Sequence, residues 1–130
     1  MPLLHLRDRD VPDDAIVMIR AGLNGLSTGK LRSDAARAHL TLGVQGVSVF
    51  ASLPGETLRA AWRDNPHIRS RPLVWCTTAG AIRKAGFPLL PTGRNERHYT
   101  VVLATTDDDR LAALASLFRR EDRQDWEVDQ

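Results

Sequence analysis

"FPLLPTGRNERHYTVVL", residues 87–103, holds two short apolar runs on either side of a loop, and this arrangement decides the fold class. The runs FPLL and HYTVVL flank the segment PTGRNER, residues 91–97, which is rich in turn-forming residue types. A connection this short joins antiparallel strands, because parallel strands need a crossover of about a dozen residues or more. The stretch therefore predicts an antiparallel hairpin in the C-terminal part of the domain.

Outward from the hairpin, the sequence alternates between strand and helix patterns. Short apolar runs bounded by Gly, Pro or turn residues predict strands over residues 15–19, 46–52 and 72–76. Helices are expected over residues 35–42, 54–65, 78–86 and 107–120. For the first helix we expect an N-cap at Ser33 or Asp34 and a C-terminal stop at Gly43, after a glycine-rich loop over residues 22–30.

These elements predict a single compact α+β domain over residues 1–120. Strict alternation of strands and helices would suggest a parallel α/β sheet, but the hairpin and the short helices favour a central, at least partly antiparallel sheet with helices packed on it. Residues 121–130 are acidic and lack a periodic apolar face, so we expect a C-terminal tail there.

Composition excludes several classes of protein. At 130 residues the chain is long enough for one hydrophobic core. A single cysteine, Cys76, allows no internal disulfide and no multi-cysteine zinc site, and its apolar setting predicts a small buried hydrophobe. No apolar run approaches the ~18 residues of a membrane span, and residues 1–10 turn charged early. We therefore expect a cytoplasmic protein without a signal peptide, anchor or membrane partner.

The charge is distributed unevenly along the chain. Residues 1–105 carry 14 Lys and Arg against 8 Asp and Glu, a balance of +6, whereas residues 106–130 carry 4 against 8, a balance of −4. Sixteen of the 18 basic residues are Arg, the side chain suited to bidentate phosphate contacts. This pattern indicates either a phosphate-bearing partner such as RNA or a merely solvated basic face.

The hairpin also carries the candidate chemistry. His98 opens the second strand, and Arg94 and Arg97 lie in the loop before it. A histidine can transfer protons near neutral pH while arginines hold an anion beside it. Because side chains alternate along a strand, His98 and Thr100 share one face and can address one ligand together. We predict catalytic roles for this pair and phosphate binding by Arg94, Arg97 and Arg20. The alternative is that His98 merely begins an edge strand, with its ring half in water.

Two short motifs share the pattern His-x-Thr followed by an apolar residue, HLTL at residues 39–42 and HYTV at residues 98–101. On these motifs, and on AGF at residues 85–87, the chain resembles the two-histidine phosphoesterases. In that family two such motifs face each other across a cleft, and no metal is required.

The resemblance implies a role for each motif residue. His39 and His98 would form the acid–base pair, and Thr41 and Thr100 would hold the phosphate oxygens. His39 can take this part only if it lies on a strand, whereas the pattern over residues 35–42 predicts a helix. The other two histidines, His5 and His67, fall in expected loops, and their spacing to acidic residues indicates no metal site.

The function expected from these patterns is metal-independent cleavage of a phosphodiester in RNA or a nucleotide, as in a bacterial toxin-like ribonuclease. General acid–base catalysis and charge stabilisation suffice for attack by the 2′-hydroxyl of RNA, so no cofactor is expected. Two alternatives stay open. One is a non-catalytic RNA- or protein-binding module, such as a homodimer or one half of a toxin–antitoxin-type pair. The other is an ADP-ribosyltransferase-like toxin, which residues 19–23 with Arg20 and Ser48 resemble faintly.

Overall fold

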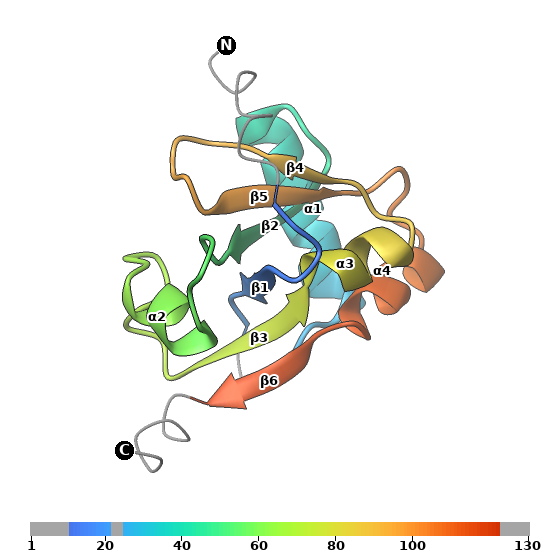
Figure 1. Ribbon diagram of the computed structural model, residues 1–130. Helices are drawn as coiled ribbons and strands as arrows, with labels where there is room; N and C mark the ends of the chain where they lie inside the picture. The colour runs from blue at the N-terminus through green and yellow to red at the C-terminus, as the bar shows by residue number, and fades with distance from the viewer. Residues whose placement is uncertain (1–10, 22–24, 123–130) are drawn as a thin grey trace.

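The computed structural model describes residues 11–21 and 25–122. Over these residues the chain builds a six-stranded sheet and four helices (Figure 1). The elements follow one another as β1 (Ile16–Ile19), α1 (Thr28–Leu42), β2 (Gly46–Ala51), α2 (Leu58–Arg63), β3 (Leu73–Thr78), α3 (Ala79–Lys84), β4 (Leu89–Pro91), β5 (His98–Val102), α4 (Asp108–Ala115) and β6 (Arg119–Asp122).

The strands lie in the order β4-β5-β2-β1-β3-β6, and each pair of neighbours in this sheet is antiparallel. The α+β prediction is confirmed, and the predicted hairpin is the β4–β5 pair, with Leu89 opposite Val101. The three strands predicted before the hairpin and the two predicted within it are all present. Among the described helices, none is both long and apolar enough to cross a membrane.

The helices divide unequally between the two faces of the sheet. One face packs against α1, α3 and α4, and its hydrophobic cluster includes Val17, Val49 and Val101 from three adjacent strands. The other face packs against α2, whose Trp62 is fully buried with Met18 and neighbouring side chains. In Figure 1 the green helix α2 accordingly stands apart from the other three helices.

Helix α1 begins earlier than the sequence predicts. Ser27, not Ser33 or Asp34, is the N-cap, and its hydroxyl accepts a hydrogen bond from the Lys30 amide at 3.0 Å. Asp34 instead lies inside the helix and pairs with the Lys30 ammonium at 2.8 Å, one turn away. The predicted stop at Gly43 is confirmed, because this residue has a left-handed φ of 74° and its amide donates to the His39 carbonyl.

Two further boundaries differ from expectation. Helix α2 begins at Leu58 with Thr57 as its N-cap, because the residues after Pro54 form a turn closed by the Glu56 carboxylate on the Leu53 amide. Helix α4 ends at Ala115, so Arg119 and Arg120, the last two residues of the helix expected over residues 107–120, lie in β6. Strand β6 also includes Glu121 and Asp122, the start of the expected tail; residues 123–130 lie outside the described residues.

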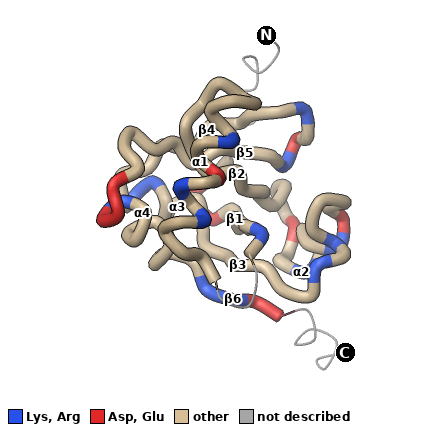
Figure 2. The backbone as a smooth tube through the Cα atoms, turned by 180° about the vertical axis from the view of Figure 1, so that it is seen from behind, with Lys and Arg blue, Asp and Glu red and all other residues tan. Residues whose placement is uncertain are grey.

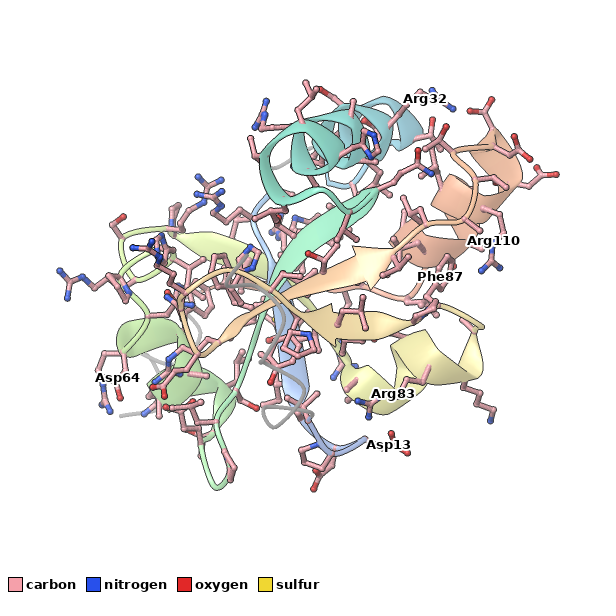
Figure 3. The ribbon with its side chains drawn as sticks, turned by 90° about the horizontal axis from the view of Figure 1, so that it is seen from above. Asp13, Arg32, Asp64, Arg83, Phe87 and Arg110 are labelled. Carbon is pink, nitrogen blue, oxygen red and sulfur yellow. The ribbon has the colours of Figure 1, made fainter. Side chains whose placement is uncertain are left out.

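Figure 3 shows contacts that join elements at the surface. Arg83 of α3 pairs with Asp13, ahead of β1, at 2.8 Å. The Arg110 guanidinium of α4 lies 4.0 Å from the ring centre of Phe87, a cation–π contact. The acidic start of α4 is visible as a red segment at one end of the molecule in Figure 2, and there Asp108 pairs with Arg32 of α1.

A buried ion pair ties the hairpin loop to the turn before α2. The Arg97 guanidinium donates two hydrogen bonds to the Glu56 carboxylate, at 2.6 and 2.8 Å. The two side chains are only 10% and 15% exposed. Arg97 lowers the pKa of Glu56 from its ordinary value of 4.5 through this hydrogen bond, against the opposing effect of burial. The pair therefore belongs to the framework of the fold.

The first test of this framework concerns the spacing of β2 and β5. A Cβ on Gly46 would lie 2.5 Å from Cγ2 of Thr100 and still closer to the Val101 carbonyl oxygen, whereas one on Gly29 of α1 would meet only the Ser27 hydroxyl, at 3.9 Å. We expect Gly46→Ala to lower the free energy of unfolding by about 1–3 kcal/mol through overpacking. Gly29→Ala, the control, should raise it by about 0.5–1 kcal/mol through better helix propensity. Urea unfolding measures both changes, and a neutral Gly46→Ala would contradict the observed spacing.

A second test concerns the Glu56–Arg97 pair. Glu56→Gln leaves a buried guanidinium without its counter-charge and should cost about 3 kcal/mol in urea unfolding at neutral pH. Because the folded-state pKa of Glu56 lies below 4.5, its contribution is fully present above pH 4.5 and is lost as pH falls through the lowered value. In Glu56→Gln the free energy of unfolding should therefore fall less between neutral and acidic pH than it does in the wild type. Glu96→Gln, at an exposed position in the same loop as Arg97, is the control and should behave like the wild type.

Candidate functional site

The candidate site lies on the face of the sheet that α2 covers. Of the six strands, only β1, β2 and β3 contribute to the hydrophobic cluster beneath α2, and no described residue of β4 or β5 joins it. Beside that cluster, over β2 and β5, the same face of the sheet carries polar side chains. The ladder between the two strands pairs Ser48 with Thr100 and Phe50 with His98, so all four side chains point to the same side.

His98 is held in one orientation by the hairpin. Its Nδ1 lies 3.0 Å from the Thr92 carbonyl oxygen and 3.0 Å from the Thr92 hydroxyl. A carbonyl oxygen only accepts hydrogen bonds, so Nδ1 carries the proton, and in the neutral ring Nε2 carries the lone pair. The Thr92 hydroxyl lies 2.7 Å from that of Thr100, which is fully buried. Thr100 thus supports the residue that orients His98.

A second histidine lies beside the same aromatic ring. The His67 ring stacks on Phe50 with centroids 5.4 Å apart and planes at 13°, while the His98 ring meets Phe50 edge-on at the same centroid distance. The two imidazoles are therefore separated by no more than twice that distance. His67 follows α2, and the Asn65 side-chain oxygen accepts a hydrogen bond from its backbone amide at 3.0 Å.

Both imidazoles line one open depression of about 400 Å³, which we name the histidine pocket. Its lining includes His67, His98, Arg94, Asn95, Thr41 and Ser48. The volume lies in the lower part of the range for small-ligand sites. Two groups that can exchange protons, with a guanidinium beside them, are the parts that acid–base chemistry on an anionic substrate requires.

A second depression, of about 340 Å³, adjoins the first, and we name it the arginine pocket. Its charged lining residues are Arg20, Arg37, Arg71, Lys30 and Asp34. Thr41 and Ser48 line both pockets, so the two depressions meet at these side chains. Four cations against one carboxylate make the arginine pocket strongly positive, which favours an anionic ligand.

Several of the residues predicted from the sequence meet in this region. His98 and Arg94 line the histidine pocket, Arg20 lines the arginine pocket, and Thr41 lines both. Thr100 lies under the histidine pocket as a buried partner of Thr92 rather than on its surface.

Arg97 and His39 lie elsewhere. Arg97 is buried against Glu56 and lines neither pocket, so the role predicted for it in phosphate binding is replaced by a structural one. His39 is exposed on α1, not on a strand, and it lines neither pocket. Thr41, two residues further along the helix, points in a different direction and donates its hydroxyl to the Arg37 carbonyl at 2.9 Å. The first His-x-Thr motif therefore does not form one half of a cleft.

Sequence reasoning gave no role to His67, Arg71 and Arg37, which line the two pockets. The two arginines gave a weak signal, since they belong to the basic excess of residues 1–105. His67 was expected in a loop without a role. No local pattern brings residues 67 and 71 to β2 and β5, because their position depends on how α2 packs across the sheet.

Neither the single cysteine nor a cluster of metal-binding side chains among the described residues belongs to the site. Cys76 is buried under α2, and burial raises the pKa of its thiol to about 12, so the thiolate is not accessible near neutral pH. The expectation of a buried, inert cysteine fits this environment. Within residues 11–21 and 25–122, no group of three or more His, Cys, Asp or Glu side chains is placed to hold a metal ion.

The orientation of His98 can be tested directly. We expect nitrogen-15 NMR of the neutral imidazole to show the proton on Nδ1, because the Thr92 carbonyl accepts from that atom. Thr92→Val keeps the carbonyl and should preserve the tautomer while removing the hydroxyl contact. Observation of the Nε2-protonated form in the wild-type protein would contradict the hydrogen bond and the orientation derived from it.

Comparison of the chain with protein-family models, with curated protein sequences and with solved structures finds no match.

Proposed function

We propose that the protein cleaves a phosphodiester bond in RNA or a nucleotide, in the manner of a small toxin-like ribonuclease. The observation that carries this proposal is the placement of two imidazoles, His67 and His98, on the ring of Phe50 in one pocket. Arg94 in the same pocket and the adjoining arginine pocket supply positive charge for the phosphate. General acid–base catalysis and charge stabilisation are sufficient for this reaction.

In the proposed reaction His98 acts as the base. Its Nε2 accepts the proton of a ribose 2′-hydroxyl, and the 2′-oxygen attacks the adjacent phosphorus. The bond from phosphorus to the 5′-oxygen breaks, and that oxygen takes a proton from the His67 imidazolium. The products are a 2′,3′-cyclic phosphate and a free 5′-hydroxyl. The Thr92 carbonyl stabilises the His98 imidazolium that forms, and Arg94 offsets charge on the phosphate oxygens.

One observation supports a second candidate function, ADP-ribosyl transfer. Arg20 and Ser48 line the arginine pocket together, as the sequence resemblance requires. Among the described residues that line the two pockets, Asp34 is the only acidic one, and it is paired with Lys30, so none of these residues offers an unpaired carboxylate to a ribose. Phosphodiester cleavage is therefore the better supported candidate.

The experiment measures cleavage of mixed RNA in the presence of a chelator by the wild type and three single variants. His98→Ala and His67→Ala should each lower turnover by about 10²–10⁴-fold, the range for loss of a general acid or base. His39→Ala, at an exposed helical position outside both pockets, should keep wild-type turnover. Circular dichroism on each variant checks that the fold is kept.

The possible results separate the candidate functions. Full activity in folded His98→Ala would overturn the proposed mechanism. Loss of activity in His39→Ala would instead support the two-histidine phosphoesterase arrangement. Binding of RNA without any cleavage by the wild type would favour the non-catalytic binding module, and transfer of ADP-ribose from a nicotinamide dinucleotide would favour the second candidate.

A further inference from the structure

The positive charge of the site is concentrated away from the histidines. The histidine pocket has one arginine, Arg94, whereas Arg20, Arg37 and Arg71 line the arginine pocket. Lys30 is compensated by Asp34, and none of the three arginines forms an ion pair with an acidic residue in the described part of the chain. A substrate with only its scissile phosphate, held at the imidazoles, would leave these three charges without an anion.

In Arg71 a single atom, Nε, lacks a hydrogen-bond partner among the described residues. This atom is buried. A buried donor without an acceptor costs about 1–3 kcal/mol, and more when the group is charged. A phosphate in the arginine pocket would supply a counter-charge for the Arg71 guanidinium.

One rigid segment connects the two pockets. The turn that follows α2 places His67 in the histidine pocket and Arg71 in the arginine pocket, four residues apart. The Trp62 indole donates to the Ile68 carbonyl at 3.0 Å, and both of these side chains are fully buried. The spacing between catalytic and cationic groups is therefore fixed by the core, as recognition of two linked groups requires.

We propose that the arginine pocket binds a second phosphate of the substrate, the neighbour of the scissile phosphate along an RNA strand. This inference rests on the proposed function, because it places the scissile phosphate at His67 and His98. Two adjoining depressions that meet at Thr41 and Ser48 suit an extended ligand with repeated phosphates. The substrate class is thus an oligonucleotide with at least two phosphates rather than a mononucleotide.

Binding can be measured apart from catalysis with 2′-deoxy oligonucleotides, which lack the attacking hydroxyl. Fluorescence anisotropy compares a labelled dinucleotide with one phosphate and a trinucleotide with two, for the wild type, Arg37→Gln, Arg71→Gln and Arg63→Gln. Arg63 is an exposed arginine of α2 outside both pockets and serves as the charge-matched control.

For the wild type and the control we expect about tenfold tighter binding of the trinucleotide. In Arg37→Gln and Arg71→Gln this preference should fall to about twofold or less. The salt dependence of trinucleotide binding should also become shallower by about 0.7 in log–log slope for a lost phosphate contact. Equal preference in all four proteins would overturn the inference.

Two further measurements complete the experiment. A competition assay identifies the source of the phosphate, and a cleavage assay separates this inference from the proposed function. Competition by a nucleoside triphosphate as strong as that by the unlabelled trinucleotide would overturn the assignment to a strand phosphate. Cleavage assays on the matching ribonucleotides should show the same preference in kcat/KM. If His98→Ala cleaves normally while the arginine variants lose their binding preference, the proposed mechanism fails and the phosphate site stands.

Discussion

The register between β2 and β5 determines which side chains face the site. It sets Phe50 opposite His98 and Ser48 opposite Thr100 on one face, and Val49 opposite Tyr99 on the other. A slip by one residue would turn His98 and Thr100 into the hydrophobic core and bring Tyr99 outward. Gly46 helps to hold this register, since its missing side chain lets the Thr100 side chain and the Val101 carbonyl approach closely. The chemistry proposed for the pockets depends on this backbone alignment.

Around that alignment, polar groups with different roles are kept apart by burial. Arg97 and Glu56 satisfy each other inside the framework, and Thr92 and Thr100 hold His98 from beneath. The residues that line the two pockets instead include Arg20 after β1, several side chains of α1, Ser48 of β2 and two residues of the segment after α2. The groups that orient His98 are thereby shielded from the pocket that its ring lines.

The sequence predicts most of the fold because its signals are local. The turn-rich segment between two apolar runs identifies the β4–β5 hairpin, and Gly43 marks the end of α1. Strand β6 is not predicted from the sequence, because its residues, RRED, have no alternation of apolar and polar side chains. It forms by pairing with the edge of β3. The start of α1 is missed because Asp34, a good cap by type, is used in an ion pair with Lys30.

The candidate site is predicted only in part, for a related reason. His98 and Arg94 are found because a histidine beside arginines is visible in the sequence, and Arg20 because residues 19–23 faintly resemble ADP-ribosyltransferases. The exclusion of Arg97 depends on Glu56, 41 positions away, and the inclusion of His67 depends on the packing of α2. Such contacts between distant segments leave no periodic trace in the chain.

The two outer strands of the described sheet carry a consequence for behaviour at high concentration. Strand β4 has only three residues and ends in Pro91, which lacks an amide hydrogen to offer a neighbour. Strand β6 carries four consecutive charged residues on the opposite border, Arg119–Asp122. Short length, proline and dense charge each oppose the addition of a foreign strand. A sheet that is antiparallel and rich in valine is thus bordered by segments that discourage fibrous self-association.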